Sequence, residues 1–170
     1  MSIKQNFTDD EWKQIVAAAP MVGLAIAAAS PSGPLGVMKE MFSVGMAMAD
    51  AVQKGSGNAL ITALIDDVKA RQTRPEKPTG VTTPESAQRV AFEQLAAIRA
   101  LVDAKAPAEA AGFKQWLCDL GQRVAEASNE GGFFGFGGER VSDAERQALA
   151  RLAGSLGVAA PNGGPASVQV

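Results

Sequence analysis

The chain has 170 residues and a formal net charge of −2, with 46% hydrophobic and 20% charged residues. Histidine and tyrosine are absent and Cys118 is the single cysteine, which excludes an internal disulfide, ordinary zinc sites and histidine-dependent catalysis. The charge balance gives no basic footprint for nucleic acid or an anionic membrane. The composition therefore favours a protein that is not an enzyme, without cofactor, catalytic residue, metal ligand or nucleic-acid partner.

The N-terminal region is polar and acidic, unlike a secretory signal. The most apolar stretch, residues 15–29, contains Pro20. It is shorter than the roughly 20 residues that a membrane-spanning helix requires. We predict a cytoplasmic protein without a transmembrane segment.

The pattern predicts an all-α protein whose first helix begins at Thr8. Thr8 and Glu11 have the spacing of a capping box, and Phe7 and Trp12 have the spacing of a hydrophobic staple. Pro20 is expected to end this helix near residue 18 or to begin the next one. Residues 21–30 have no polar face, which is typical of a buried helix.

Further helices are expected over residues 34–54, from Asn58, from Thr83, from Pro107 and over residues 142–156. In the helix after Asn58 the apolar stripe comprises Leu60, Ile61, Leu64, Ile65 and Val68, with Asp66, Asp67 and Lys69 as polar positions. Residues 71–82 are expected to form a long loop. The sum is a single bundle of about seven helices, one domain over residues 1–157, and a disordered tail over residues 158–170.

An alternative arrangement is two similar helical halves. Residues 27–36 and residues 125–131 share one order: an alanine-rich segment ends at a serine and is followed by a glycine-containing turn. A glutamate comes later in each case, Glu40 after the first segment and Glu145 after the second. This correspondence covers few positions, so the single bundle and the duplicated plan both stay open.

The most unusual stretch is the glycine- and phenylalanine-rich segment of residues 131–138, the Gly-Phe loop. Its rings can fold back over the end of the bundle, with the glycines permitting positive φ. Alternatively they dock on a partner, a membrane interface or a second copy. The second interpretation makes Phe133, Phe134 and Phe136 the candidate interaction residues. A phosphate-binding loop is not favoured, because no strand precedes it and no Gly-Lys-Ser/Thr follows.

Two other groups of residues are candidate sites. Methionines cluster at positions 38, 41, 46 and 48 and suit core packing, a soft metal or an adaptable groove. Glu40, Asp66 and Asp67 are oxygen donors of the kind that Ca²⁺ and Mg²⁺ prefer, but they lack an EF-hand spacing. Core packing and solvated carboxylates are the favoured interpretations.

Three segments resemble a family of small bacterial hypothetical proteins of unknown function. They are FTDDEWKQIVAAAPMVG, SPSGPLGVMKE and the run from KAPAEAAGFKQWL to VAEASNEGGFFGFGGERVSDAE. The resemblance covers most of the chain and implies a bacterial, cytoplasmic origin.

The segment VSDAERQALARLAGSLG is similar to the last helix of TerB-like tellurite-resistance proteins. That resemblance implies a helical bundle with a duplicated helix-loop-helix plan, a role in stress response and acidic metal-binding positions. Only Glu40 and Glu145 match such positions, and the Asp-Gly turn of that group is replaced by Ser32-Gly33 and Glu130-Gly131. The leading hypothesis is thus a non-catalytic helical bundle that associates with itself or a partner, and the alternative is a TerB-like protein that binds a metal ion through carboxylates.

Overall fold

The computed structural model describes residues 2–29, 57–75, 78–129 and 141–159. All regular elements in these ranges are helical: η1 (Ile3–Asn6), α1 (Asp9–Ala27), α3 (Ala59–Ala70), α4 (Pro84–Lys105), α5 (Pro107–Asn129) and α6 (Asp143–Leu156). The predicted all-α class is confirmed for these ranges. The expected number of about seven helices is wrong for them, because they contain five α-helices and one short 3-10 helix.

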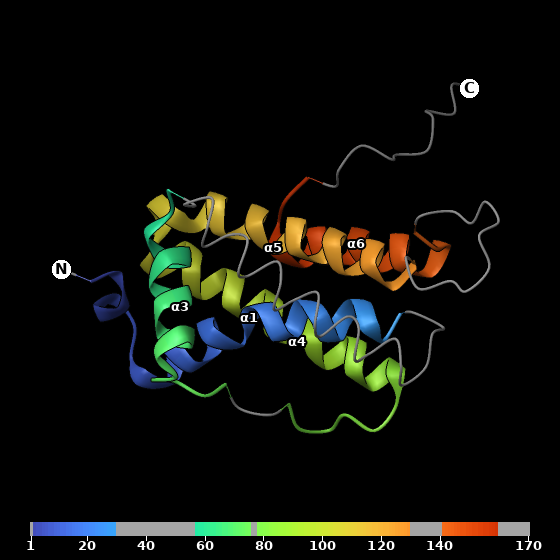
Figure 1. Cartoon of the computed structure of the whole chain (residues 1–170), viewed down its shortest axis with the longest axis horizontal. Helices are drawn as coiled ribbons and strands as arrows, with labels where there is room; N and C mark the ends of the chain where they lie inside the picture. Colours follow the sequence, from blue (N-terminus) through green and yellow to red (C-terminus); the bar gives the residue numbers. More distant parts are fainter. Residues whose placement is uncertain (1, 30–56, 76–77, 130–140, 160–170) are drawn as a thin grey trace.

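The four longest helices form two pairs that share one core. Figure 1 shows α5 and α6 side by side above α1 and α4, with α3 crossing one end of this group at a steep angle. Helix α1 packs most extensively against α4 and also contacts α5 and α6, and α3 contacts η1, α5 and α1. Helix α3 therefore lies at the edge of the bundle, where its C-terminal end approaches α1.

The core consists of large side chains from every α-helix named above. The fully buried ones are Trp12, Phe113, Ile15, Ile26, Leu60, Leu64, Leu95, Ile98, Leu117, Leu120, Leu152 and Leu156. Burial of a large apolar side chain contributes roughly 1.5–3 kcal/mol, so this shared interior is the main source of stability. Helices α4, α5 and α6 supply seven of these twelve residues.

The start of α1 has the predicted capping box and hydrophobic staple. The Thr8 hydroxyl accepts a hydrogen bond from the Glu11 backbone N–H at 3.3 Å, and a Glu11 carboxylate oxygen accepts one from the Thr8 N–H at 2.7 Å. The rings of Phe7 and Trp12 are buried with centroids 5.8 Å apart. Glu11 also pairs with Lys105 at 2.6 Å, which ties the start of α1 to the end of α4.

The predicted break at Pro20 is wrong, because α1 continues through it to Ala27. Pro20 has no N–H, so it cannot donate the usual helical hydrogen bond to the Val16 carbonyl, a loss that costs about 3 kcal/mol in a helix interior. The residues on both sides are buried, including Val16, Val22 and Ile26. A continuous buried surface on both sides of the proline outweighs the local penalty.

The other predicted helix starts are confirmed where the structure describes them. Thr83 caps α4 with Pro84 in its first turn, and α5 begins at Pro107. Ser142 and Glu145 form the predicted capping box of α6. The expected helix over residues 34–54 lies outside the described residues, as does the tail beyond residue 159.

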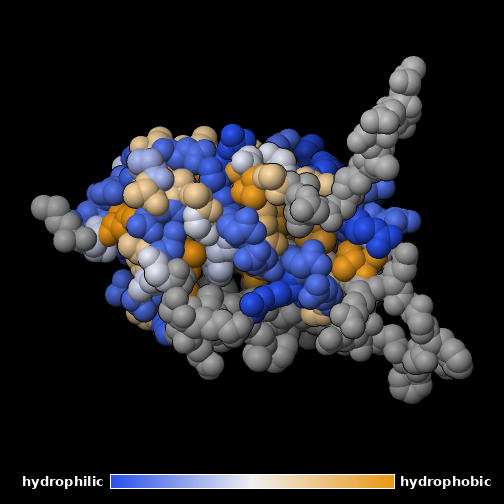
Figure 2. Space-filling model, turned by 90° about the horizontal axis from the view of Figure 1, so that it is seen from above, coloured by the Kyte–Doolittle hydropathy of each residue, from blue (hydrophilic) through white to orange (hydrophobic). Residues whose placement is uncertain are grey.

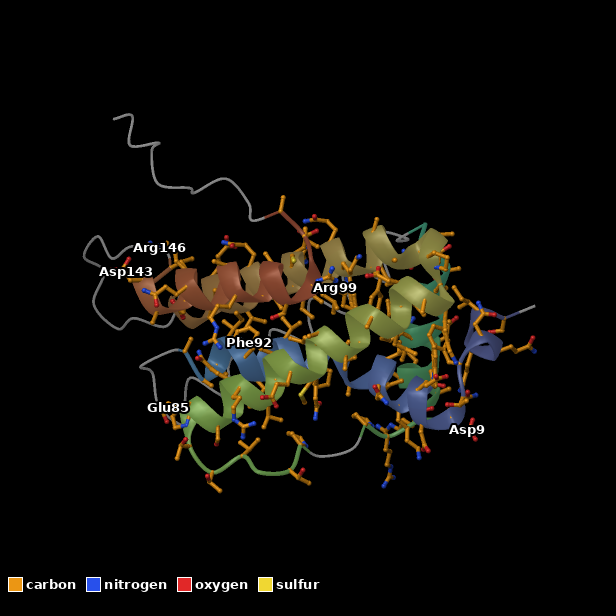
Figure 3. The ribbon with its side chains drawn as sticks, turned by 180° about the vertical axis from the view of Figure 1, so that it is seen from behind. Asp9, Glu85, Phe92, Arg99, Asp143 and Arg146 are labelled. Atoms are coloured by element: carbon orange, nitrogen blue, oxygen red, sulfur yellow. The ribbon has the colours of Figure 1, made fainter. Side chains whose placement is uncertain are left out.

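Side-chain contacts fix α6 against α4. Figure 3 shows Phe92 on α4 lying next to α6, where the Arg151 guanidinium carbon is 4.5 Å from the centre of its ring. Arg99, further along α4, lies beside the end of α6, and a Cβ at Gly157 would be 2.5 Å from its guanidinium carbon. Gly157 has φ of 66°, so both its conformation and its close contact favour glycine.

The first turn of α3 is held by α5. The Asn58 side-chain oxygen accepts hydrogen bonds from the Leu60 and Ile61 N–H groups, and its amide nitrogen donates to the Glu109 carbonyl at 2.9 Å. The Glu109 carboxylate accepts from the Ala59 N–H at 2.8 Å. Two helix ends thus share their capping groups, which sets the steep angle of α3 and the position of its far end.

Candidate interaction site

A buried carboxylate on α3 connects four separate parts of the chain. Asp67 is 4% exposed. It accepts hydrogen bonds from Lys4 Nζ, from Trp12 Nε1 at 3.1 Å and from the Thr73 backbone N–H at 3.0 Å. These donors come from η1, α1 and the segment that follows α3. We call this group the Asp67 cluster.

The hydrogen bonds keep this carboxylate ionised. Burial by itself would raise the pKa of Asp67, but hydrogen bonds from Lys4, Thr73 and Trp12, with the charge of Lys4, outweigh it and hold the pKa below its ordinary value. The fully occupied carboxylate fixes the first residues after α3 beside α1. Its role is to position the chain, since all three donors belong to the protein itself.

The last turn of α3 ends in a left-handed residue that is not glycine. The Gln72 N–H donates to the Asp67 carbonyl and the Arg71 N–H to the Val68 carbonyl, each at 3.1 Å, which is the Schellman pattern. Arg71 has φ of 52° and is the only non-glycine residue with positive φ in the described ranges. Gly157 closes α6 with the same pattern, so the two helix ends form a matched comparison.

A small groove lies between α1, the end of α3 and the residues that follow it, which we call the α1–α3 groove. In Figure 1 this region is at the lower left, where the chain leaves α3 and turns under α1. Its volume is about 210 Å³, and the described residues that line it are Val16, Pro20, Val68, Arg71, Thr73, Arg74 and Pro75. Four of these residues contribute aliphatic groups, and two contribute guanidinium groups.

Val68, Arg71 and Arg74 give this groove its chemical character. Val68 is 38% exposed and is the only large hydrophobic side chain in the exposed class among the described residues. Arg71 and Arg74 are exposed, and neither guanidinium forms an ion pair or side-chain hydrogen bond within the described part of the chain. The groove thus combines an exposed aliphatic group with two cations that have no protein partner there.

The surface over α5 and α6 has a different character. Figure 2 shows hydrophilic residues across most of this face, with smaller hydrophobic patches between them. Such scattered apolar groups are normal on a soluble protein and indicate no site. The α1–α3 groove differs because exposed Val68 lines it together with two arginines that have no ion-pair partner in the described ranges.

A second hollow of about 410 Å³ lies between α1 and α4. Its lining includes Asp10 and Lys13, which pair with each other at 2.8 Å, and the amides of Gln14 and Gln94. A self-compensating ion pair and exposed amides give no preference for a particular ligand class. We therefore regard the α1–α3 groove as the better candidate.

None of the described residues predicted to form a site lines the α1–α3 groove. Phe133, Phe134 and Phe136 lie outside the described residues, as do Glu40 and the methionines at positions 38–48. Glu145 is 1% exposed, and its carboxylate accepts hydrogen bonds from the Ser142 N–H and hydroxyl at 2.8 Å, so it caps α6. Among the described residues no group of three His, Cys, Asp or Glu could hold a metal ion. The TerB-like metal site stays a prediction.

Cys118 on α5 is a partly buried thiol. Burial, with a smaller effect of the neighbouring Asp119 charge, raises its pKa to about 11. The thiol is therefore protonated at neutral pH and is a weak nucleophile. A partly buried thiol of this kind is typical of a structural cysteine.

Two neighbouring residues of α3 lie in environments that differ from the predicted ones. Val68 belongs to the predicted apolar stripe but is exposed, whereas Asp67 is a predicted polar position but is buried. One feature of the sequence does point to the end of α3. Arg71, and not glycine, follows the helical stripe directly. Glycine is the usual residue at such a helix end, so an arginine there marks the position as a candidate for a role other than ending the helix.

No described helix is long and apolar enough to cross a membrane. Comparison with known proteins gives no match to a protein-family model, to a curated protein or to a solved structure.

Proposed function

We propose that this protein is a non-catalytic helical-bundle protein that acts by associating with another protein or with a second copy of itself. The observation that carries the proposal is the α1–α3 groove, which is lined by exposed Val68 and by Arg71 and Arg74, two arginines without an ion-pair partner among the described residues. Arginine is enriched at protein interfaces, and the buried centre of an interface is more apolar than the rest of the surface. The residues that follow α3 are held in place by the Asp67 cluster, so binding there requires little ordering of the backbone.

A photo-crosslinking amino acid at position 68 tests this proposal directly. The control carries the same group at Ala100, which is exposed on α4 away from the groove. We expect a crosslink to a defined protein, or to a second copy of the chain, from position 68 and not from position 100. The proposal fails if position 68 gives no crosslink and sedimentation velocity shows an unaccompanied monomer at every concentration.

The Gly-Phe loop provides a separate test of the same function. If the rings of Phe133, Phe134 and Phe136 form an interaction surface, each change to Ser should weaken association while the helical content is retained. Circular dichroism checks the helices and sedimentation velocity checks association. Unchanged association in all three variants would remove the loop from the proposal and leave the α1–α3 groove as its basis.

A further inference from the structure

We infer that the α1–α3 groove binds an acidic peptide segment in which an aliphatic side chain lies next to one or two carboxylates. This inference rests on the proposed function, since it names the chemistry of the partner. It follows from three features of the groove: cations without an ion-pair partner among the described residues, the left-handed conformation of Arg71, and the aliphatic lining.

The first feature is a local excess of positive charge on an acidic chain. Lys69, Arg71 and Arg74 follow each other closely at the end of α3, and none has an ion-pair partner within the described residues. The nearest buried acid, Asp67, is already occupied by Lys4, Trp12 and Thr73. The net charge of the chain is −2, so this cationic edge is a local feature. It therefore favours an anionic partner at this position.

The second feature is the conformation of Arg71. A residue with φ of 52° is more favourable as glycine, and α6 ends in the same hydrogen-bond pattern with Gly157. Lys69 is already in the last turn of α3 to interact with the helix dipole. Arg71 in this conformation lines the groove. A glycine would be sufficient to end the helix, so the arginine side chain is not needed for that purpose.

The third feature is the lining, which selects between classes of anion. Among the described residues that line the groove, Val68 and the half-buried Pro20 present aliphatic surface, Val16 is buried, and none is aromatic. Proteins that hold single-stranded nucleic acid without sequence preference generally stack bases on aromatic side chains. An aliphatic anchor with adjacent carboxylates fits this lining better, because guanidinium groups pair with carboxylates through two parallel hydrogen bonds. The volume of about 210 Å³ suits one anchoring side chain.

Binding of defined peptides to the full chain tests the inference. The probe is the blocked peptide acetyl-Gly-Glu-Leu-Asp-Gly-amide, compared with versions in which Gln and Asn replace the acids or Ser replaces Leu. Chemical-shift changes of the backbone amide and methyl resonances locate the binding site. Fluorescence polarisation of labelled peptides gives the affinities. We expect this original peptide, called the acidic Leu peptide, to shift the NMR resonances of Val16, Val68 and Thr73. Both altered peptides should bind more weakly, and the acidic Leu peptide should bind more weakly at high salt.

Variants separate recognition from folding. Arg71→Gly and Arg74→Gln should each lower the affinity for the acidic Leu peptide by about threefold to fivefold, which corresponds to the loss of one exposed ion pair. Arg71→Gly keeps the backbone pattern seen at Gly157 and relieves the left-handed conformation, so its melting temperature should be about 2–4 °C higher. Arg89→Gln on α4, which changes the net charge equally, serves as the matched control and should bind as the unaltered chain does.

Three results would overturn the inference. They are no localised shifts with the acidic Leu peptide, equal binding of its neutral version, and tighter binding of a single-stranded oligonucleotide at the same residues. If position 68 still crosslinks to a protein in any of these cases, the proposed association stands and only the acidic partner is refuted. If both experiments fail, both proposals fail.

Discussion

Replacing Asp67 by alanine removes the acceptor of three hydrogen bonds from a nearly closed site. Trp12 Nε1 and the Thr73 N–H lose their partner, and the indole is 1% exposed. A buried donor left without an acceptor costs about 1–3 kcal/mol. Lys4 is 36% exposed and regains water, so its share is small. We expect the free energy of unfolding to fall by about 3 kcal/mol, or the melting temperature by about 9 °C.

Urea unfolding followed by circular dichroism measures this loss, and Asp66→Ala is the matched control. Asp66 is the exposed neighbour on the same helix, and its replacement should change the free energy of unfolding by less than about 0.5 kcal/mol. Lys4→Met should cost about 1 kcal/mol, because two donors still hold the carboxylate. If Asp67→Ala were no more destabilising than Asp66→Ala, the Asp67 cluster would not hold the end of α3.

The same variant has a defined pH dependence. Because the folded pKa of Asp67 is below its ordinary value near 3.8, its ionised form stabilises the fold above that pH. This contribution is lost as the pH falls through the lower folded pKa. The difference in stability between the unaltered chain and Asp67→Ala should be constant above about pH 5 and should narrow below the ordinary value. A difference that widened on acidification would contradict the assigned direction.

The remaining predictions concern single residues in α5, in α6 and at the end of α3. A Cβ at Gly121 would lie 2.5 Å from Leu152, which is fully buried, so Gly121→Ala should destabilise by about 1–3 kcal/mol in urea unfolding. Gly154→Ala meets no atom within 4 Å and should stabilise by about 0.5–1 kcal/mol, and equal effects of the two changes would refute the close packing. Cys118 should react slowly with a disulfide reagent at neutral pH and about tenfold faster for each unit of pH until its pKa near 11. Arg71→Gly should raise the melting temperature by about 2–4 °C through relief of its left-handed conformation, and a lower value would show that the side chain stabilises the helix end.

Much of the helical framework could be predicted from short-range patterns. The capping boxes at Thr8 and Ser142 and the proline start at Pro107 depend on residues within one turn of each other. Such interactions form wherever those residues become helical, so spacing in the sequence is sufficient to find them. The candidate site was not accessible in this way, because its lining joins α1 to residues some fifty positions later in the chain.

The sequence by itself determined that the chain is helical, where most of the described helices begin, and that histidine chemistry is absent. Only the tertiary structure decided that α1 passes through Pro20 and that Asp67 is buried while Val68 is exposed. The local pattern penalises a proline inside a helix and a carboxylate inside a core. Packing on both sides of Pro20 outweighs the first penalty, and donors from η1, α1 and the segment after α3 remove the second. Both depend on groups that are distant along the chain and meet only in the folded molecule.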